Sequence, residues 1–518
     1  MGNGSASSGR ELSMAFNSFA FLVFVIIAAV GYYWIPRRFQ WVWLLGFSYL
    51  YYLSYGTGLV GYLLFTTVTT WLGAGLLEHE KVKESKNYRK TILIVTLVLN
   101  FGMLGILKYL NFLILNLNRM FDGRLTFLDL ALPVGISFYI FQSMGYLLDV
   151  YWKRQKAEKN LFRFALFVSF FPQILQGPIG RYSRLAGQLF EEHRWDGRRA
   201  EEGLQRILWG FFKKMIIADT AAPFVAALFD EYQTYPGLAI FAVLAYSAQL
   251  YGDFSGGIDI VIGISRIFGI TLDENFKRPF FARSITDFWH RWHITLGTWM
   301  KDYVFYPVSL SRWMSQFGKT AKKIFGKTTG RVLPICLANL IVFFVVGVWH
   351  GAAWKFIVYG LYNGGIIAFS GLMAPHYRTW KKKLGIVEKS SGWQLFQIVR
   401  TFILVNISWF FDRADTIPQA LTMMKNSVTH WTPAQLLQVP VGLAGGTSYT
   451  LSALIILLMG VCVLFVYSLL EENGKNPMEI LRGCPGWVRI AVYLMVFLAL
   501  PTLGQLPSDT GGFIYAQF

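Results

Sequence analysis

Two histidine-containing segments carry the residue types best suited to group-transfer chemistry. His350 ends the apolar run VVGVWH, and His293 lies in DFWHRWHITL, three residues after His290. A neutral imidazole can accept a proton near pH 7, so either ring could act as a general base. Glycine and alanine follow His350 and are expected to leave room beside its ring. On residue type alone, each ring is equally compatible with a packed, hydrogen-bonded core histidine.

His290 and His293 could instead bind a metal ion. His290 and His293 are three residues apart, which would place both side chains on one face of a helix. No HExxH motif is present, and no third ligand lies nearby in the sequence. Three cysteines at 336, 462 and 484 have no ligand-like spacing. The sequence therefore predicts no metal site, and it does not indicate which residues would bind a cofactor.

A third segment places charges in an apolar, glycine-rich run, YGDFSGGIDIVIGISRIFG at 251–269. Its charged residues are Asp253, Asp259 and Arg266. Ionisable groups are costly inside the membrane, so they mark functional sites or internal ion pairs. Asp259 and Arg266 are two helical turns apart and share a helix face. The pattern favours an internal polar network between packed helices.

The elements that position these residues are predicted to cross a membrane. Of 518 residues, 54% are hydrophobic and 15% are charged, whereas a soluble chain carries about 25% charge. A span needs about 20 apolar residues, and we expect 11 to 13 crossings. Residues 285–307 are too polar to face lipid and are expected in an aqueous funnel or as a re-entrant helix. The predicted class is an all-α polytopic membrane protein.

The net charge of +19, from 48 basic and 29 acidic residues, fits this class. Basic residues of multi-span proteins gather in cytoplasmic loops, so nucleic acid is not an expected partner and membrane lipids are. Two basic stretches, 311–331 and 378–383, are expected on the cytoplasmic side. They serve topology and lipid contact, or they dock an anionic phosphopantetheine donor.

Taken in order, the motifs resemble the membrane-bound O-acyltransferase family, and within it the bacterial branch of alginate O-acetyltransferase and D-alanyl teichoic-acid transferase. The resemblance runs from Met14 to the C-terminus. The segments that carry it are MAFNSFAFLVF, LPVGISFYIFQSMGYLLDVY, SFFPQILQGPIGRYSRL, YGDFSGGIDIVIGISRIFGI, DFWHRWHITLGTWMKDYVFYP and GVWHGAAWKFIVYGLYNG.

The resemblance implies a ring of tilted helices around a central funnel or tunnel, in a multi-pass protein of the bacterial cell membrane. It places the family's membrane-embedded histidine on His350 and its second histidine on His293. Residues expected to line or support the tunnel are Trp289, Trp292, Trp349 and Asp287. The implied reaction moves an acyl group, expected to be acetyl, from a cytoplasmic thioester to hydroxyls of a cell-envelope or extracellular polysaccharide. The donor would be acetyl-CoA or a phosphopantetheinyl carrier protein.

The chain ends differ from the body. Residues 1–13 are expected to be a tag or disordered segment, 14–510 the transmembrane domain, and 511–518 an aromatic tail with the sequence GGFIYAQF. By resemblance, Tyr515 would relay the acyl group to an extracellular serine esterase-like partner of the SGNH type. A merely anchoring tail is the alternative.

Three other functions remain open at this point. One is D-alanyl transfer to teichoic acid, which the chain's length and its own aromatic tail disfavour. Another is transport, because intramembrane charges and broken helices also suit a transporter. The third is a non-catalytic membrane scaffold. An acyl-transfer assay with labelled acetyl-CoA separates a transferase from a transporter, and activity that survives loss of both His293 and His350 would support the scaffold.

Overall fold

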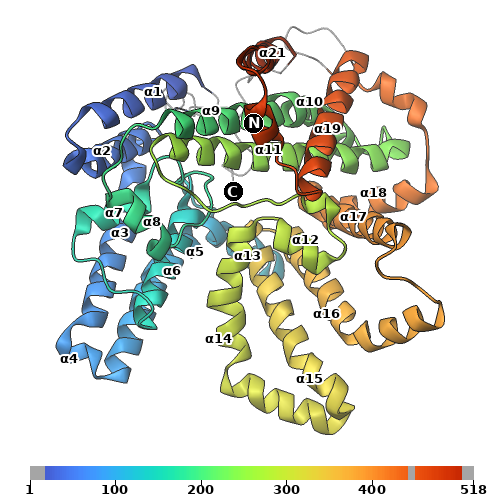
Figure 1. Cartoon of the computed structure of the whole chain (residues 1–518). Helices are drawn as coiled ribbons and strands as arrows, with labels where there is room; N and C mark the ends of the chain where they lie inside the picture. The colour runs from blue at the N-terminus through green and yellow to red at the C-terminus, as the bar shows by residue number, and fades with distance from the viewer. Residues whose placement is uncertain (1–13, 15–17, 442–449, 504–518) are drawn as a thin grey trace. The chain divides into compact units, whose positions relative to one another are not determined.

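The computed structural model describes residues 14, 18–441 and 450–503 (Figure 1). Within them, regular structure is helical, with one isolated β-bridge between Phe276 and Trp292. The all-α class predicted from the sequence is confirmed. Residues 1–13 and the aromatic tail with Tyr515 lie outside the described residues, so the expected boundaries of the chain ends stay predictions.

Seven helical segments in the described part of the chain are long and apolar enough to cross a membrane. They are α3 (Thr57–Glu78), α5 (Lys86–Phe121), the segment Pro236–Ile267 containing α11 (Ala239–Ile267), α15 (Arg312–His350), α16 (Trp354–Lys383), α17 (Ser391–Arg413) and α19 (Thr450–Glu472). The chain is therefore a multi-pass membrane protein.

This number is smaller than the 11 to 13 crossings expected, because several apolar stretches form shorter helices. α1 (Phe19–Trp34) has 16 residues, α2 (Gln40–Leu53) has 14 and α7 (Leu161–Ser169) has nine. At 1.5 Å per residue, such helices fall short of the roughly 30 Å hydrocarbon layer. The ring of helices around a tunnel stays a prediction.

The chain divides into two compact units, residues 1–211, 256–273 and 509–518 in unit 1 and residues 212–255 and 274–508 in unit 2. In unit 1, α3 packs against α5 and α6 (Ile136–Tyr151), and α2 packs against α7. α4 (Glu80–Lys83) joins α3 to α5, and α8 (Tyr182–Phe190) packs on α7.

Glycines set one close approach in unit 1. α9 (Gly197–Phe211) lies along the second half of α11. A Cβ added at Gly203 would lie 2.6 Å from the carbonyl oxygen of Gly263, and one at Gly210 would lie 2.6 Å from that of Gly256. Only residues without a side chain allow the two backbones this separation. The glycine-rich run thus packs helices closely and does not unwind.

Unit 2 is built on the pair α15 and α16, which run side by side (Figure 1). Ser311 caps the start of α15, and Ser390 caps α17, each accepting a backbone N–H two or three residues into its helix. α17 packs on α16 and on α18 (Ile417–Thr429). The remaining helices are α10 (Asp219–Asp230), α12 (Ile285–Arg291), α13 (Ile294–Met300), α14 (Tyr306–Ser309), α20 (Pro477–Gly483) and α21 (Gly486–Leu503).

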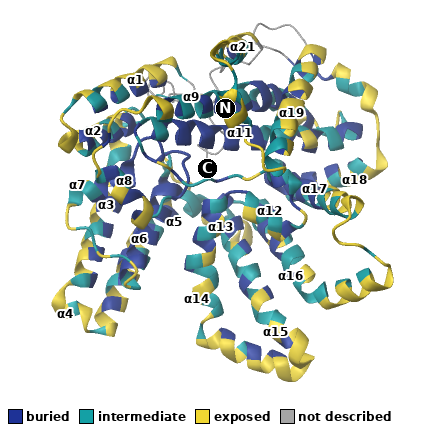
Figure 2. Cartoon of the chain, viewed as in Figure 1, coloured by how far each residue is buried: buried dark blue, intermediate teal, exposed yellow. Residues whose placement is uncertain are grey.

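α11 is the best-shielded of the seven candidate spans (Figure 2). In its segment, 67% of the most apolar stretch is buried, against 22% to 39% in the other six. Those six expose large apolar side chains suited to lipid contact, such as Leu99, Phe369 and Val466. Burial of α11 inside the protein explains why this helix can carry aspartates.

Candidate functional site

A pocket of about 290 Å³ in unit 2 is the strongest candidate for a substrate site. It combines apolar walls with a few polar groups, as ligand pockets do. Its apolar lining includes Trp289, Leu296, Met300, Phe305 and Phe343, and its polar lining includes Thr286, His290, His293, Lys301 and Asn339. The segment 285–307 therefore contributes to the lining of this cavity, and its expected place in an aqueous funnel or as a re-entrant helix stays a prediction.

His293 lies at the break between two short helices. α12 starts at its Ser284 cap and ends at Arg291, and His293 then adopts a left-handed conformation with φ 46° and ψ 52° before α13. The expectation that His290 and His293 share one helix face is therefore wrong, although both line the pocket. Among the described residues, no group of three or more His, Cys, Asp or Glu is placed to hold a metal ion.

Asn275 determines which nitrogen of His293 carries a proton. Its Oδ1 accepts the backbone N–H of Thr295 at 3.0 Å, and this N–H can only donate. The same oxygen lies 3.2 Å from Nδ1 of His293, so Nδ1 must carry the proton of that hydrogen bond. In the neutral ring, Nε2 is then the basic nitrogen. His293 is 1% exposed, and burial, with a smaller effect from the charge of His350, holds the pKa of His293 well below its ordinary value.

His350 is the last residue of α15 and is also buried. Its ring centroid lies 5.0 Å from that of Tyr359 and 6.3 Å from that of Phe356. The room expected beside His350 is filled, because a Cβ at Gly351 would clash with the Phe356 ring. Gly351 therefore allows the Phe356 ring to pack against His350.

Asp412, at the end of α17, is the functional candidate that sequence reasoning missed. Its Oδ1 lies 3.7 Å from Nδ1 of His350, and its Oδ2 accepts the hydroxyl of Tyr246 at 2.7 Å. Lys355 donates to the backbone oxygens of Asp412 and Ala414. The available signal was an acidic residue that directly follows the aromatic triplet WFF at the end of a mostly apolar stretch.

Trp349 lies against both histidines. Its ring centroid is 5.6 Å from that of His293 and 5.3 Å from that of His350. His293 lines the pocket, whereas His350 is not among the lining residues. The structure thus brings three predicted site residues together, with one histidine at the pocket wall and the other beside Trp349 and Asp412.

The other predicted site residues support this arrangement. Trp292 stacks on Phe288 at 5.5 Å and packs against Trp409 at 5.4 Å between ring centroids. Trp289 lines the pocket and donates to Asn363. Asp287 accepts from Arg291 at 2.9 Å, and Arg291 also pairs with Glu472 of α19 at 3.0 Å. Asp287 therefore fixes α12, which carries Trp289 and is followed directly by Trp292.

The charged residues of the third segment pair with residues of opposite charge. In unit 1, Asp259 pairs with Arg206 at 2.6 Å, and Nε of Arg266 donates to Glu202 at 2.8 Å. In unit 2, Lys214 of the π-helical segment Phe212–Ala218 bridges Asp219 at 2.8 Å and Asp253 at 2.7 Å. The polar network favoured by the sequence is present as these ion pairs.

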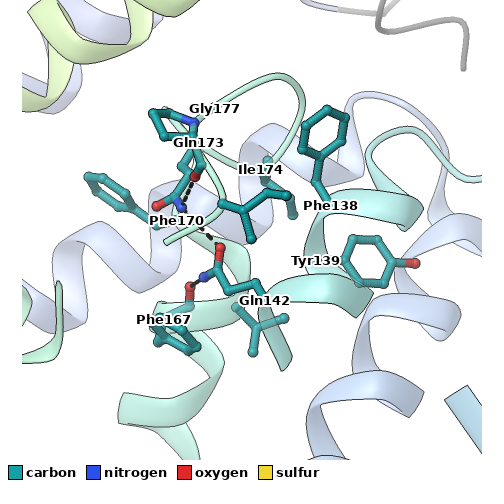
Figure 3. Close-up of a pocket in the computed structure, with 11 residues that line it drawn as sticks. Phe138, Tyr139, Gln142, Phe167, Phe170, Gln173, Ile174 and Gly177 are labelled. Carbon is teal, nitrogen blue, oxygen red and sulfur yellow. Dashed lines mark hydrogen bonds between the residues drawn. The ribbon is translucent and has the colours of Figure 1, made fainter. Parts of the chain in front are cut away.

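A second concave region, in unit 1, is a packed core and not a binding site (Figure 3). Gln173 donates to Gln142 at 3.0 Å, and Gln142 donates to the backbone oxygen of Phe167. Phe138 and Ile174 lie around the two amides (Figure 3). The space between these side chains does not admit a water molecule.

Comparison with known proteins places these features in context. A family model described as "MBOAT, membrane-bound O-acyltransferase family" matches residues 153–320. A probable alginate O-acetylase, AlgI, of Azotobacter vinelandii is 32% identical over 419 residues, covering 79% of this chain and 77% of the relative. A peptidoglycan O-acetyltransferase of Helicobacter pylori is 32% identical, covering 81% and 80%. A teichoic acid D-alanyltransferase of Bacillus subtilis is 29% identical, covering 54% and 67%.

Proposed function

The chain belongs to the membrane-bound O-acyltransferase family and is an O-acyltransferase, and we propose that it transfers acetyl groups to hydroxyls of an extracellular or cell-envelope polysaccharide. The relatives with the higher identity and coverage are named for O-acetylation of alginate or peptidoglycan. The observation that carries the proposal is a buried histidine at the pocket wall, His293, joined through Trp349 to a second buried histidine, His350, whose Nδ1 faces the carboxylate of Asp412.

The pocket suits the arm of a thioester donor. Its apolar walls can hold an acyl-pantetheine chain, and Trp289 and Phe343 exclude water that would hydrolyse the thioester. Lys301 is an exposed cation of the same lining and can pair with the phosphate of acetyl-CoA or of a carrier protein's phosphopantetheine. We propose these thioesters as donors and no tightly bound cofactor.

The histidines supply the proton transfer. A hydroxyl becomes a competent nucleophile when a base removes its proton as it attacks the thioester carbonyl, an effect of about 10²–10⁴-fold. His350 is the proposed base, and His293 at the pocket wall is proposed to orient the donor. The indole of Trp349 contacts both the proposed base and the histidine proposed to orient the donor.

The test is transfer of labelled acetyl from acetyl-CoA, or from an acetylated carrier protein, to polysaccharide by the purified, membrane-reconstituted protein. His350→Ala should lower transfer at least about 100-fold per molecule of folded protein. His430→Ala is the matched control, because His430 is exposed and bonds to its neighbour Thr429. Near-normal transfer by His350→Ala would contradict the proposal, and transfer of D-alanine but not acetyl would favour the teichoic-acid reaction.

Tyr515 is proposed to relay the acetyl group. Its phenol oxygen would attack the thioester carbonyl, and the resulting ester would be passed to a serine of an extracellular SGNH-type partner. Support comes from the resemblance of the tail GGFIYAQF to those of the bacterial branch. Tyr515→Phe should abolish polymer acetylation, and Phe518→Leu, which keeps the phenol, should not. Full activity of Tyr515→Phe would contradict the relay and favour a tail that only anchors the chain.

A further inference from the structure

We propose that Asp412 is a positioning residue for His350, and that it decides which of the two buried histidines takes the proton. The proposal rests on the acyl transfer proposed above and assigns distinct roles to its two rings. It is carried by the geometry around Asp412 and by the different partners of the two imidazoles.

Asp412 is held so that one oxygen remains for the imidazole. The residue is 6% exposed, and its Oδ2 is engaged by the hydroxyl of Tyr246 at 2.7 Å. Its Oδ1 has no hydrogen-bond partner within the described residues and lies 3.7 Å from Nδ1 of His350. Catalytic hydrogen bonds are often long in a resting enzyme and shorten in the reacting complex.

Once this contact closes to hydrogen-bonding distance in the reacting complex, it selects a tautomer of His350. An ionised carboxylate can only accept, so the nitrogen that faces it carries the proton. Nε2 is then the basic nitrogen, as it is in His293. The two rings are therefore prepared in the same way but by different partners, a carboxylate for His350 and an amide oxygen from Asn275 for His293.

The charge on the Asp412 carboxylate, which the Asn275 amide lacks, gives the two histidines different roles. When a ring gains a proton, an adjacent carboxylate stabilises the positive charge, whereas a neutral amide does so far less. The hydroxyl proton therefore moves to Nε2 of His350 while the oxygen's electron pair forms the new C–O bond. The C–S bond then breaks with its electrons on sulfur, and the proton returns from Nε2 to the thiolate. His293 stays neutral throughout.

The other ionisable groups around this pair leave the assignment intact. Lys355 is directed at backbone oxygens of Asp412 and Ala414, not at the carboxylate. Arg413 pairs with Asp230 at 2.9 Å. Tyr246 donates its hydroxyl to Oδ2 of Asp412, and Tyr359 contacts the imidazole through its ring. Among the described residues, Asp412 is thus the carboxylate that lies within ion-pair distance of His350.

The experiment compares Asp412→Asn with Asp415→Asn in the reconstituted full chain. Asp415 is exposed and three residues farther on, so its variant should behave as the unmodified protein. Asp412→Asn should lower kcat at least about 100-fold with KM for acetyl-CoA changed less than about 3-fold, because the residue acts through the base and not on the donor. The acid-side midpoint of its pH–rate curve should move to lower pH, because the charge that favours the imidazolium is gone.

Tyr246→Phe gives a second measurement that keeps the carboxylate. It should lower kcat about 3- to 10-fold by freeing Oδ2, and it decides the question if Asp412→Asn does not fold. An unchanged kcat and pH midpoint in folded Asp412→Asn and Tyr246→Phe would overturn the positioning role. If His350→Ala is inactive in the same assay, the proposed function still stands. Full activity of His350→Ala would remove both.

Discussion

Oδ1 of Asn275 receives the backbone N–H of Thr295 and the Nδ1–H of His293, at 3.0 Å and 3.2 Å. A rigid backbone donor thus fixes the orientation of the amide, and the amide fixes the tautomer of the histidine. The bond also holds a ring whose pKa is lowered by burial and, to a lesser extent, by the charge of His350. His293 is therefore neutral at pH 7 and stays so as the pH falls through the usual range of histidine.

Asn275→Asp tests this neutrality. A carboxylate at this position would favour protonation of His293, so transfer should fall on the acid side, and the pH–rate midpoint should rise by about one unit. The readout is labelled acetyl transfer from pH 5.5 to 8.5. Thr295→Val removes only the hydroxyl bond to the same oxygen and should leave the curve in place. An unshifted pH–rate curve in Asn275→Asp would mean that protonation of His293 does not affect the reaction.

Lys301→Ala should weaken donor binding. Loss of a cation at the pocket should raise KM for acetyl-CoA about 5-fold at low salt, with kcat nearly unchanged, because the phosphate contact is equal in ground and transition states. The difference should shrink as ionic strength rises. Lys425, an exposed residue of α18 outside both the pocket lining and the two basic stretches, provides the control Lys425→Ala. Equal KM values would place the donor phosphate elsewhere.

Gly360→Ala should destabilise the α15–α16 pair. A Cβ at Gly360 would meet the carbonyl oxygen of Phe343, so the helices must separate at a cost of about 1–3 kcal/mol. Gly365→Ala is a control on the same helix, since a Cβ there meets nothing within 4 Å. Thermal unfolding in detergent distinguishes them. Equal midpoints for the two variants would mean that the helices tolerate a wider separation.

Asp253→Ala should also destabilise the fold. It leaves Lys214, 3% exposed, with one carboxylate partner in place of two, and breaking a buried pair costs about 3–5 kcal/mol. Arg184→Ala breaks a pair with Asp273 in which the arginine is 69% exposed, and such pairs contribute about 0–1 kcal/mol. A similar loss of stability in both variants would contradict the structural role of Asp253.

Much of the site could be read from local sequence. Composition alone predicts a helical membrane protein, and the apolar run before His350 predicts a buried ring, because both depend on neighbouring residues. The break at His293 was missed, since a spacing of three residues reads as one helix turn when nothing local indicates that the chain leaves the helix. The family resemblance, not residue physics, singled out these two histidines.

Long-range pairing is the part that sequence could not supply. Asp412 is 62 positions from His350 in the chain, and Asn275 is 18 positions from His293. Each becomes a partner only through the packing of separate helices. The cation partners of the intramembrane aspartates, Arg206 and Lys214, are likewise on other segments. A single sequence shows the need for a partner but not its identity.

The backbone of His293 has a consequence for engineering this protein. A left-handed φ is unfavourable for a residue with a Cβ and costs nothing special for glycine. A glycine at this position would relieve the backbone and lose the buried imidazole with its contacts, and a screen for heat tolerance alone has no means of retaining the chemistry of that ring. Any such campaign should select for turnover alongside robustness, or exclude codon 293 from the mutated library.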